Sequence, residues 1–173
     1  MDDRDLLRAG IRDISDFPKP GIVFKDLTPL LSNGALLVTT LDLLTAPWRD
    51  HGITVVAGIE ARGFLLAPMV AERLGVGMVP LRKPGKLPWR TVAETYNLEY
   101  GTDTLEIHED AVSSTDRVLL VDDVLATGGT AGAAVRLLRR VGAEVVGCAF
   151  VIELGFLAGR DALDTPVTSV LAY

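Results

Sequence analysis

Two adjacent carboxylates and a short loop of small, hydroxyl-bearing residues form the segment of this sequence best suited to chemistry. Apolar residues 118–121 lead directly into Asp122 and Asp123, and the loop of residues 126–130 comes soon after. Residues 131–140 continue with a helical pattern. This order predicts an anion site: a buried strand ends in two acids, a glycine turn follows, and a helix begins directly after the turn. Amide groups converge at a helix N-terminus, and the helix dipole adds roughly half a positive charge.

The residues of this loop are suited to a phosphate group. Gly128 and Gly129 let the backbone turn sharply and approach a ligand closely. Thr127 and Thr130 add hydroxyl donors for phosphate oxygens, and Ala126 belongs to the same predicted binding segment.

The two acids need a different partner, because carboxylates beside a phosphate repel it. Ionised carboxylates only accept hydrogen bonds, and sugar hydroxyls can donate them. Neighbours in a regular strand point to opposite faces, so we expect Asp122 and Asp123 to converge only where the strand gives way to the loop. The implied ligand is a ribose 5-phosphate.

Other phosphate sites match this segment less well. A Walker loop is excluded because no Gly-Lys-Ser or Gly-Lys-Thr occurs in the chain. A dinucleotide site is disfavoured because Gly-x-Gly-x-x-Gly does not follow the strand and the acids precede the loop. The plainest alternative is a tight strand-to-helix connection with no ligand.

The surrounding pattern alternates strands and helices. Residues 53–59 and 77–81 are predicted strands, and residues 64–74 between them are a predicted helix that Gly75 ends. Pro68 indicates that this helix starts no earlier than about residue 64, if proline is tolerated only in the first turn.

A second unit repeats the order. It comprises a strand over residues 117–121, a helix over residues 129–141 with Gly142 as its cap, and a strand over residues 144–152. Such units predict an open, mostly parallel α/β sheet flanked by helices. Ligands bind at the carboxyl ends of the strands in these sheets, so we expect the turn at residues 60–63 and the acidic loop to share one crevice.

Two further regions complete the expected elements. The N-terminal part predicts a helix over residues 3–14, an extended or turning stretch over residues 17–25, and a second helix that Ser32 or Asn33 caps and that stops before Pro47. Residues 89–108 are polar and weakly alternating, which predicts a flexible β-ribbon projecting from the sheet.

Composition limits the class of protein. The chain has 173 residues and a net charge of −6, from 17 basic and 23 acidic residues. A nucleic-acid binder would usually carry a basic excess, and no apolar run approaches the length of a membrane span. The acidic start does not resemble a secretory signal, and the single cysteine, Cys148, allows no disulfide within the chain. We therefore expect a cytoplasmic protein that binds neither nucleic acid nor membrane.

Residues 118–130 resemble the phosphoribosyl pyrophosphate (PRPP) motif of the type I phosphoribosyltransferases. Four further segments resemble the adenine phosphoribosyltransferase family in the same order, namely residues 17–26, 60–64, 82–88 and 96–101. The resemblance covers nearly the whole chain. It implies a single Rossmann-like domain over residues 1–173, with a base-binding hood at about residues 1–30 and a flexible catalytic lid at about residues 89–108.

The resemblance also implies a reaction, the transfer of the phosphoribosyl group from PRPP to adenine to give AMP and pyrophosphate. Mg²⁺, held mainly through PRPP, would support the leaving pyrophosphate. Arg62, Arg82, Lys83 and Lys86 would bind the pyrophosphate. The superfamily often has a cis peptide in the first loop, which corresponds here to Glu60–Ala61.

Base recognition and lid chemistry are implied for two short segments. Val23 and Lys25 would read the purine edge through their backbones while Phe24 stacks on its face. In the lid, Glu99 would approach the base to manage a purine proton, with Tyr100 beside it. Residues 95–97 would help to screen the anomeric carbon from water.

Plainer roles stay open for these residues. Arg62 could form a surface ion pair, the cluster at residues 82–86 could be a solvated loop, Phe24 could belong to a local core and Glu99 could serve solubility alone. The protein could also act on xanthine, guanine or orotate, or be a non-catalytic sensor of PRPP or a nucleotide. The family implies a homodimer that takes adenine and PRPP as small-molecule substrates.

Overall fold

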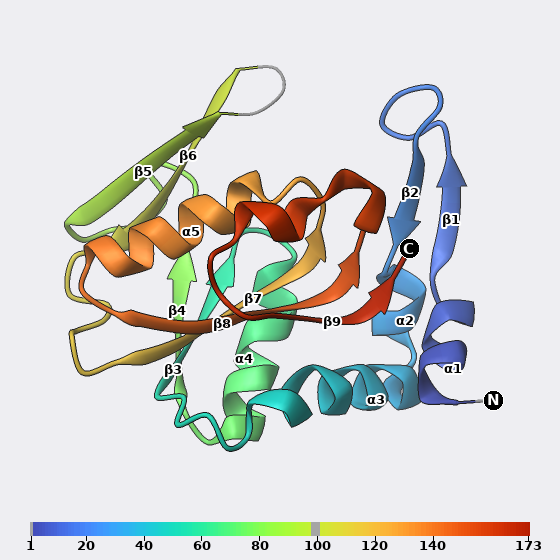
Figure 1. The fold of residues 1–173 in the computed structure, drawn as a ribbon, viewed down its shortest axis with the longest axis horizontal. Coiled ribbons are helices and arrows are strands. Elements are labelled where there is room, and N and C mark those ends of the chain that lie inside the picture. Colours follow the sequence, from blue (N-terminus) through green and yellow to red (C-terminus); the bar gives the residue numbers. More distant parts are fainter. Residues whose placement is uncertain (1, 98–100) are drawn as a thin grey trace. The chain divides into compact units, whose positions relative to one another are not determined.

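The computed structural model describes residues 2–97 and 101–173 (Figure 1). The chain forms two compact units, Met1–Leu43 and Leu44–Tyr173. The first unit contains the predicted hood, and the second contains the predicted crevice and ribbon. The lid residues Glu99 and Tyr100 lie outside the described residues.

The first unit consists of three helices and one hairpin. Its elements are α1 (Asp3–Ala9), β1 (Arg12–Ser15), β2 (Val23–Asp26), α2 (Thr28–Ser32) and α3 (Gly34–Thr45), and the division between the units falls within α3. Strands β1 and β2 pair antiparallel.

The helix expected over residues 3–14 is shorter than predicted. Asp2 starts it with a capping box, but Gly10 forms its C-cap and donates to carbonyls of the last turn. Ile14 lies instead in β1, opposite Phe24. The prediction was wrong because apolar residues at helical spacing continued past a glycine that ends the helix.

The second predicted helix is confirmed. The Asn33 side chain accepts from the amides of Ala35 and Leu36 at 3.1 and 3.2 Å, as an N-cap does. The helix ends before Pro47, which lies in the 3₁₀ turn η1 (Ala46–Trp48). Helix α2 was not predicted.

The second unit contains a five-stranded sheet with helices and a separate ribbon. Its elements are β3 (Val55–Ile59), α4 (Gly63–Leu74), β4 (Gly77–Leu81), β5 (Thr91–Asn97), β6 (Thr102–His108), β7 (Arg117–Leu125), α5 (Gly129–Arg140), β8 (Glu144–Glu153), η2 (Gly155–Leu157), η3 (Gly159–Ala162) and β9 (Val167–Ala172). The sheet has the order β4-β3-β7-β8-β9, and all its pairs are parallel. The predicted fold class is confirmed.

Helices α4 and α5 cover opposite faces of this sheet. A Cβ added to Gly58 would lie 2.6 Å from Ala67 of α4, so this position of β3 faces α4. Its neighbours Ala57 and Ile59 belong to the core cluster that contains the apolar residues of α5. The alternation of side chains along a strand therefore separates the two layers.

Helix α4 begins at Gly63, one residue before the predicted start. The argument from Pro68 was wrong, because this proline lies inside the helix and not in its first turn. There it cannot donate the usual amide hydrogen bond to the carbonyl four residues earlier. Gly75 ends the helix in a left-handed conformation, as predicted.

The predicted ribbon is the antiparallel pair β5–β6 (Figure 1). One face of the ribbon is part of the core, because Tyr96, Leu105 and Ile107 are buried in the cluster that α5 shares. Glu94 also accepts from Arg136 at 2.8 Å and pairs with Arg140 at 3.2 Å, both on α5. The flexibility of the ribbon stays a prediction.

Strand β7 runs four residues beyond its predicted end at Val121. It pairs with β8 through Asp122, Val124 and Leu125. The prediction was wrong because carboxylates usually mark the end of a buried strand, whereas here they lie within it. Strand β9 and the two 3₁₀ turns after β8 were not predicted. Within the described part of the chain, no helix has the length and apolar character that crossing a membrane requires.

Candidate active site

The two loops singled out by sequence leave the sheet at one edge. Strands β3 and β7 are parallel neighbours, with Gly58 opposite Val121, and both end at this edge. The chain proceeds from β3 outward to β4 and then returns to the other side of β3 with β7. The strand order therefore switches between β3 and β7, and such a switch point is where open α/β sheets bind ligands.

The loop after β7 leads into the N-terminus of α5 at this sheet edge, where the predicted crevice lies. Gly128 has φ +81° and is the N-cap of α5, and no side chain caps the helix there among the described residues. The first amide groups of a helix have no acceptor within it. Residues 129–131 thus present backbone donors at the positive end of α5, where an anion is stabilised.

A close backbone contact sets the shape of this loop. A Cβ on Gly128 would collide with the carbonyl oxygen of Gly159, and a Cβ on Gly159 would collide with that of Ala126. Residues 126–128 therefore lie directly against the start of η3. Sequence reasoning missed Gly159, because its role depends on a partner loop far away in the sequence.

The acidic pair lies in β7 and contacts the turn after β3. Asp123 is 5% exposed and forms an ion pair with Arg62. Oxygen Oδ1 of Asp122 accepts from the backbone amide of Asp123 at 2.9 Å and would lie 2.9 Å from a Cβ on Gly63. Only a glycine therefore fits at the start of α4 beside this carboxylate.

The carboxyl group of Asp122 has a strongly perturbed pKa. Burial raises the pKa of Asp122 well above its ordinary value, and the negative charge of Asp123 raises it further. The positive charge of Arg62 acts in the opposite direction. Burial therefore disfavours the ionised form of Asp122, and a ligand that donates hydrogen bonds to this carboxylate or brings a cation would stabilise it.

The turn after β3 holds the basic cluster in place through Glu60. The peptide bond between Glu60 and Ala61 is cis, as the resemblance implied. Glu60 pairs with Lys86, accepts from the Lys83 amide at 2.9 Å and lies 3.5 Å from Arg82 Nε. Burial alone would raise the pKa of Glu60, but Lys86, the Lys83 amide and Arg82 together lower it.

A chain of polar contacts continues from Lys83 to α5. The Lys83 ammonium pairs with Asp103 of β6 and lies 3.4 Å from the Tyr96 hydroxyl. Tyr96 donates to Asp103 at 3.2 Å, and the Thr130 hydroxyl donates to Tyr96 at 3.3 Å. The structure thus connects the predicted pyrophosphate residues with the predicted phosphate loop. Sequence reasoning had assigned no role to Asp103.

The predicted base-binding residues lie on β2 of the first unit. Val23 is 49% exposed, and the half-buried Phe24 packs edge-on against Phe17 with ring centroids 5.3 Å apart. Lys25 donates to Asp13 at 2.7 Å across the hairpin. The aromatic contact with Phe17, which is 51% exposed, was not predicted.

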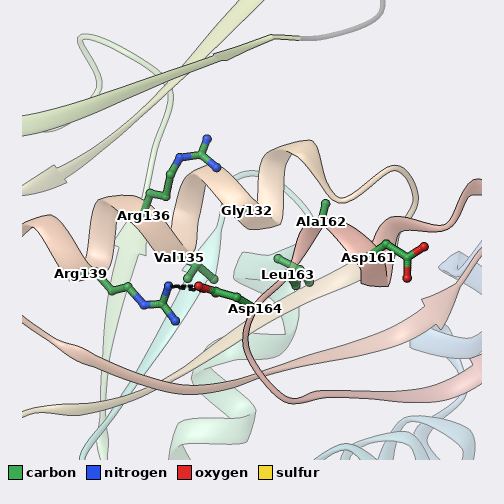
Figure 2. A pocket seen from close by; sticks show the side chains of 8 residues that line it. All are labelled: Gly132, Val135, Arg136, Arg139, Asp161, Ala162, Leu163 and Asp164. Atoms are coloured by element: carbon green, nitrogen blue, oxygen red, sulfur yellow. Dashed lines mark hydrogen bonds and ion pairs between the residues drawn. The ribbon is translucent and has the colours of Figure 1, made fainter.

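A second hollow lies between α5 and the segment of residues 161–164 (Figure 2). It has a volume of about 310 Å³, and its lining includes Arg136, Arg139 and Asp164. Arg139 donates to both oxygens of Asp164 at 2.9 and 2.8 Å, and Arg136 donates to Glu94. The residues that line this hollow do not include residues 126–130, so the amide groups at the N-terminus of α5 favour the sheet edge over this hollow as the phosphate site.

Comparisons with known proteins agree with the site. A phosphoribosyl transferase domain matches residues 46–171. The adenine phosphoribosyltransferase of Parafrankia sp. is 60% identical over 167 residues, which cover 96% of this chain and 91% of that protein. The chain belongs to the adenine phosphoribosyltransferase family.

Solved structures of the family share the fold. The enzyme of Rhodothermus marinus is 53% identical with a TM-score of 0.94, covering 99% of this chain and 98% of that one. The Giardia lamblia enzyme, in complex with 9-deazaadenine, is 40% identical with a TM-score of 0.94, covering 100% and 99%. The activity of this chain is that of the family, a glycosyl transfer from PRPP to adenine in purine salvage.

Two neighbouring glycines should respond oppositely to alanine. Gly128→Ala should lower the free energy of unfolding by at least about 1–2 kcal/mol, because an L-residue strains at left-handed φ and its Cβ collides with Gly159. Gly129→Ala should be neutral or stabilise α5 by up to about 1 kcal/mol, because its Cβ would meet its nearest atom at 3.7 Å. Urea denaturation measures both, and equal effects would contradict the assigned loop shape.

Proposed function

We propose that the transfer takes place in the crevice between the ends of β3 and β7. The loop at residues 126–130 binds the 5-phosphate, the acidic pair binds the ribose hydroxyls, and Arg62 with the basic cluster binds the pyrophosphate. The observation that carries the proposal is the parallel pairing of β3 with β7, which brings a helix N-terminus and a cluster of cations to one sheet edge.

The ribose lies between opposite charges in this arrangement. The reaction builds positive charge on the sugar as the bond to pyrophosphate breaks, in an oxocarbenium-like transition state. Asp122 and Asp123 stabilise that charge while they accept from the ribose hydroxyls. Their orientation is supported by the ion pair of Asp123 with Arg62 and by the hydrogen bond that the Asp123 backbone amide donates to Oδ1 of Asp122.

Arg62 lies beside the acidic pair and is placed to bind the leaving pyrophosphate. It is the N-cap of α4 and keeps 52% of its side chain exposed while it pairs with Asp123. A guanidinium offers five N–H donors and binds phosphate oxygens in a fork geometry. Lys83 and Lys86 add charge beside it, and Arg82 supports the loop that carries them.

We include Mg²⁺ in the proposal, held mainly through PRPP. Among the described residues, no group of three or more His, Cys, Asp or Glu side chains is arranged to hold a metal ion. The proposal is supported by the two adjacent carboxylates, Asp122 and Asp123, which would attract a cation brought with the substrate. When bound, it would withdraw charge from the leaving pyrophosphate.

Adenine is assigned to Val23, Phe24 and Lys25 by the family resemblance. Val23 at the start of β2 is exposed, and the Giardia relative binds the adenine analogue 9-deazaadenine. Glu99 and Tyr100 are proposed as lid residues that act on the purine proton. Residues 95–97 stay proposed as a screen against water, and Tyr96 of this group is buried.

Assembly and location are further parts of the proposal. The family resemblance supports a homodimer. A cytoplasmic location is supported by the single cysteine, Cys148, which allows no disulfide within the chain. Burial raises the pKa of its thiol to about 12.

Base selectivity provides the first test of the proposed adenine site. Adenine should be used at least roughly a hundredfold better than hypoxanthine, guanine, xanthine or orotate, because a site built to bond the 6-amino group leaves polar groups unpaired with a 6-oxo base. Initial rates of pyrophosphate release with PRPP and Mg²⁺ give the ratios. Comparable rates with a 6-oxopurine would reject the assigned base recognition while leaving the fold intact.

The phosphate loop is tested by Gly129→Val. A branched side chain at this position should abolish PRPP binding with a modest loss of stability, because it prevents close backbone approach. Thr127→Ala should weaken binding by about 1 kcal/mol or somewhat more, as expected for a hydrogen bond to a charged group. Calorimetric titration with PRPP and Mg²⁺ measures both. Unchanged affinity in both variants would show that the phosphate binds elsewhere.

The lid is tested by Glu99→Gln. Turnover should fall at least roughly tenfold, because general acid–base catalysis typically contributes a hundredfold or more, while PRPP affinity should stay within a factor of about three. Glu109→Gln, an exposed carboxylate paired with Arg90, is the matched control. Steady-state rates and direct PRPP binding decide the role. Near-normal turnover would show that Glu99 is a solvated lid residue with no catalytic role.

A further inference from the structure

Lys83 is occupied by a carboxylate of the protein itself. Its ammonium pairs with Asp103, and the two side chains are 34% and 30% exposed, so the pair lies open to solvent. Burial by itself would lower the pKa of Lys83, but the hydrogen bond to Asp103 raises it overall. A substrate anion that binds Lys83 must therefore compete with Asp103.

Asp103 does not depend on Lys83 for its hydrogen bonds. Its Oδ1 accepts from the Thr104 amide at 2.8 Å, and its Oδ2 accepts from the Tyr96 hydroxyl at 3.2 Å. Tyr96 is buried, and Thr130 donates to it, so the acceptor side of the pair is fixed to the N-terminal turn of α5. If Lys83 leaves, Asp103 keeps two donors and its position.

The backbone of Lys83 is fixed independently of its side chain. Its amide donates to Glu60, which also pairs with Lys86 and is largely buried at 11% exposure. Glu60 is therefore bound from several sides and maintains the loop. Asp103 contacts the lysine only through the flexible side-chain end, and that contact can be exchanged by side-chain rotation alone.

We propose that Asp103 is a positioning residue that holds the Lys83 ammonium before PRPP binds and yields it to the pyrophosphate group. The inference rests on the proposed placement of pyrophosphate at the basic cluster. Asp103 keeps the Lys83 ammonium beside the N-terminus of α5. Because the substrate must displace Asp103, the affinity for pyrophosphate and PRPP is lower than it would be without this carboxylate. Ligands without a pyrophosphate group, such as AMP, do not need this exchange.

Asp103→Asn tests the exchange, because it removes the charge that holds Lys83 and keeps the shape of the side chain. The amide oxygen still accepts from the Thr104 amide, and the NH2 group that replaces Oδ2 can donate to the oxygen of the Tyr96 hydroxyl. Pyrophosphate with Mg²⁺, and PRPP with Mg²⁺, should bind about two- to fivefold more tightly, the range that exposed ion pairs span. The KM for PRPP should fall by the same factor. AMP affinity should not change. Calorimetry and steady-state kinetics provide these values.

Two further variants make the test specific. In a Lys83→Gln background, which alone should weaken pyrophosphate binding at least about tenfold, Asp103→Asn should have no further effect, because the partner of the pair is gone. Asp164→Asn removes a carboxylate that pairs with Arg139 near the second hollow, and it controls for net charge. It should leave all affinities unchanged.

The outcomes separate the inference from the function. If Lys83→Gln leaves pyrophosphate affinity unchanged, the placement of pyrophosphate is wrong and the inference falls with it. If Lys83→Gln weakens binding but Asp103→Asn does not tighten it, only the exchange is overturned. A loss of AMP affinity in Asp103→Asn would show that the contact is structural and would also overturn it.

Discussion

The parallel pairing of β3 with β7 is the constraint on which the site depends. These strands adjoin in space although the ribbon and two other elements separate them in sequence, and the helices that follow them cover opposite faces of the sheet. The turn that bears Arg62 and the loop that begins α5 consequently open onto the same edge. The ion pair between Arg62 and Asp123 joins them. A register shift of one residue would turn every side chain of β7 to the other face and separate this pair.

An acidic protein that binds a polyanion must concentrate positive charge locally, and this chain does so with carboxylates beside each cation. Arg62 pairs with Asp123, Lys86 with Glu60 and Lys83 with Asp103. These carboxylates orient the cations before the substrate arrives, and a helix dipole adds positive potential without a further side chain. The same pairing reduces the affinity that the cations offer to a substrate. The site therefore combines preorganisation with moderate attraction.

Much of the fold follows from local pattern, and much of the site does not. Strand β4 occupies the predicted residues 77–81, and Asn33 caps α3 as its spacing indicated, because both signals lie within a few residues. The end of β7 was misjudged because the burial of Asp122 and Asp123 depends on partners in another loop. Gly159 and Asp103 gave no local signal, since one matters through a backbone contact and the other through a cross-strand ion pair. Sequence therefore indicated the loops that we propose to bind the substrate, and the structure shows which contacts hold these loops in place.

The most direct test of this account is a crystal structure of the protein with AMP, read for the position of the 5′-phosphate. The account predicts that the phosphate oxygens lie within hydrogen-bond distance of the amides of residues 127–130, with the ribose hydroxyls on Asp122 and Asp123. A phosphate bound instead by Arg136 and Arg139 in the second hollow, with the α5 N-terminus free of ligand, would contradict it.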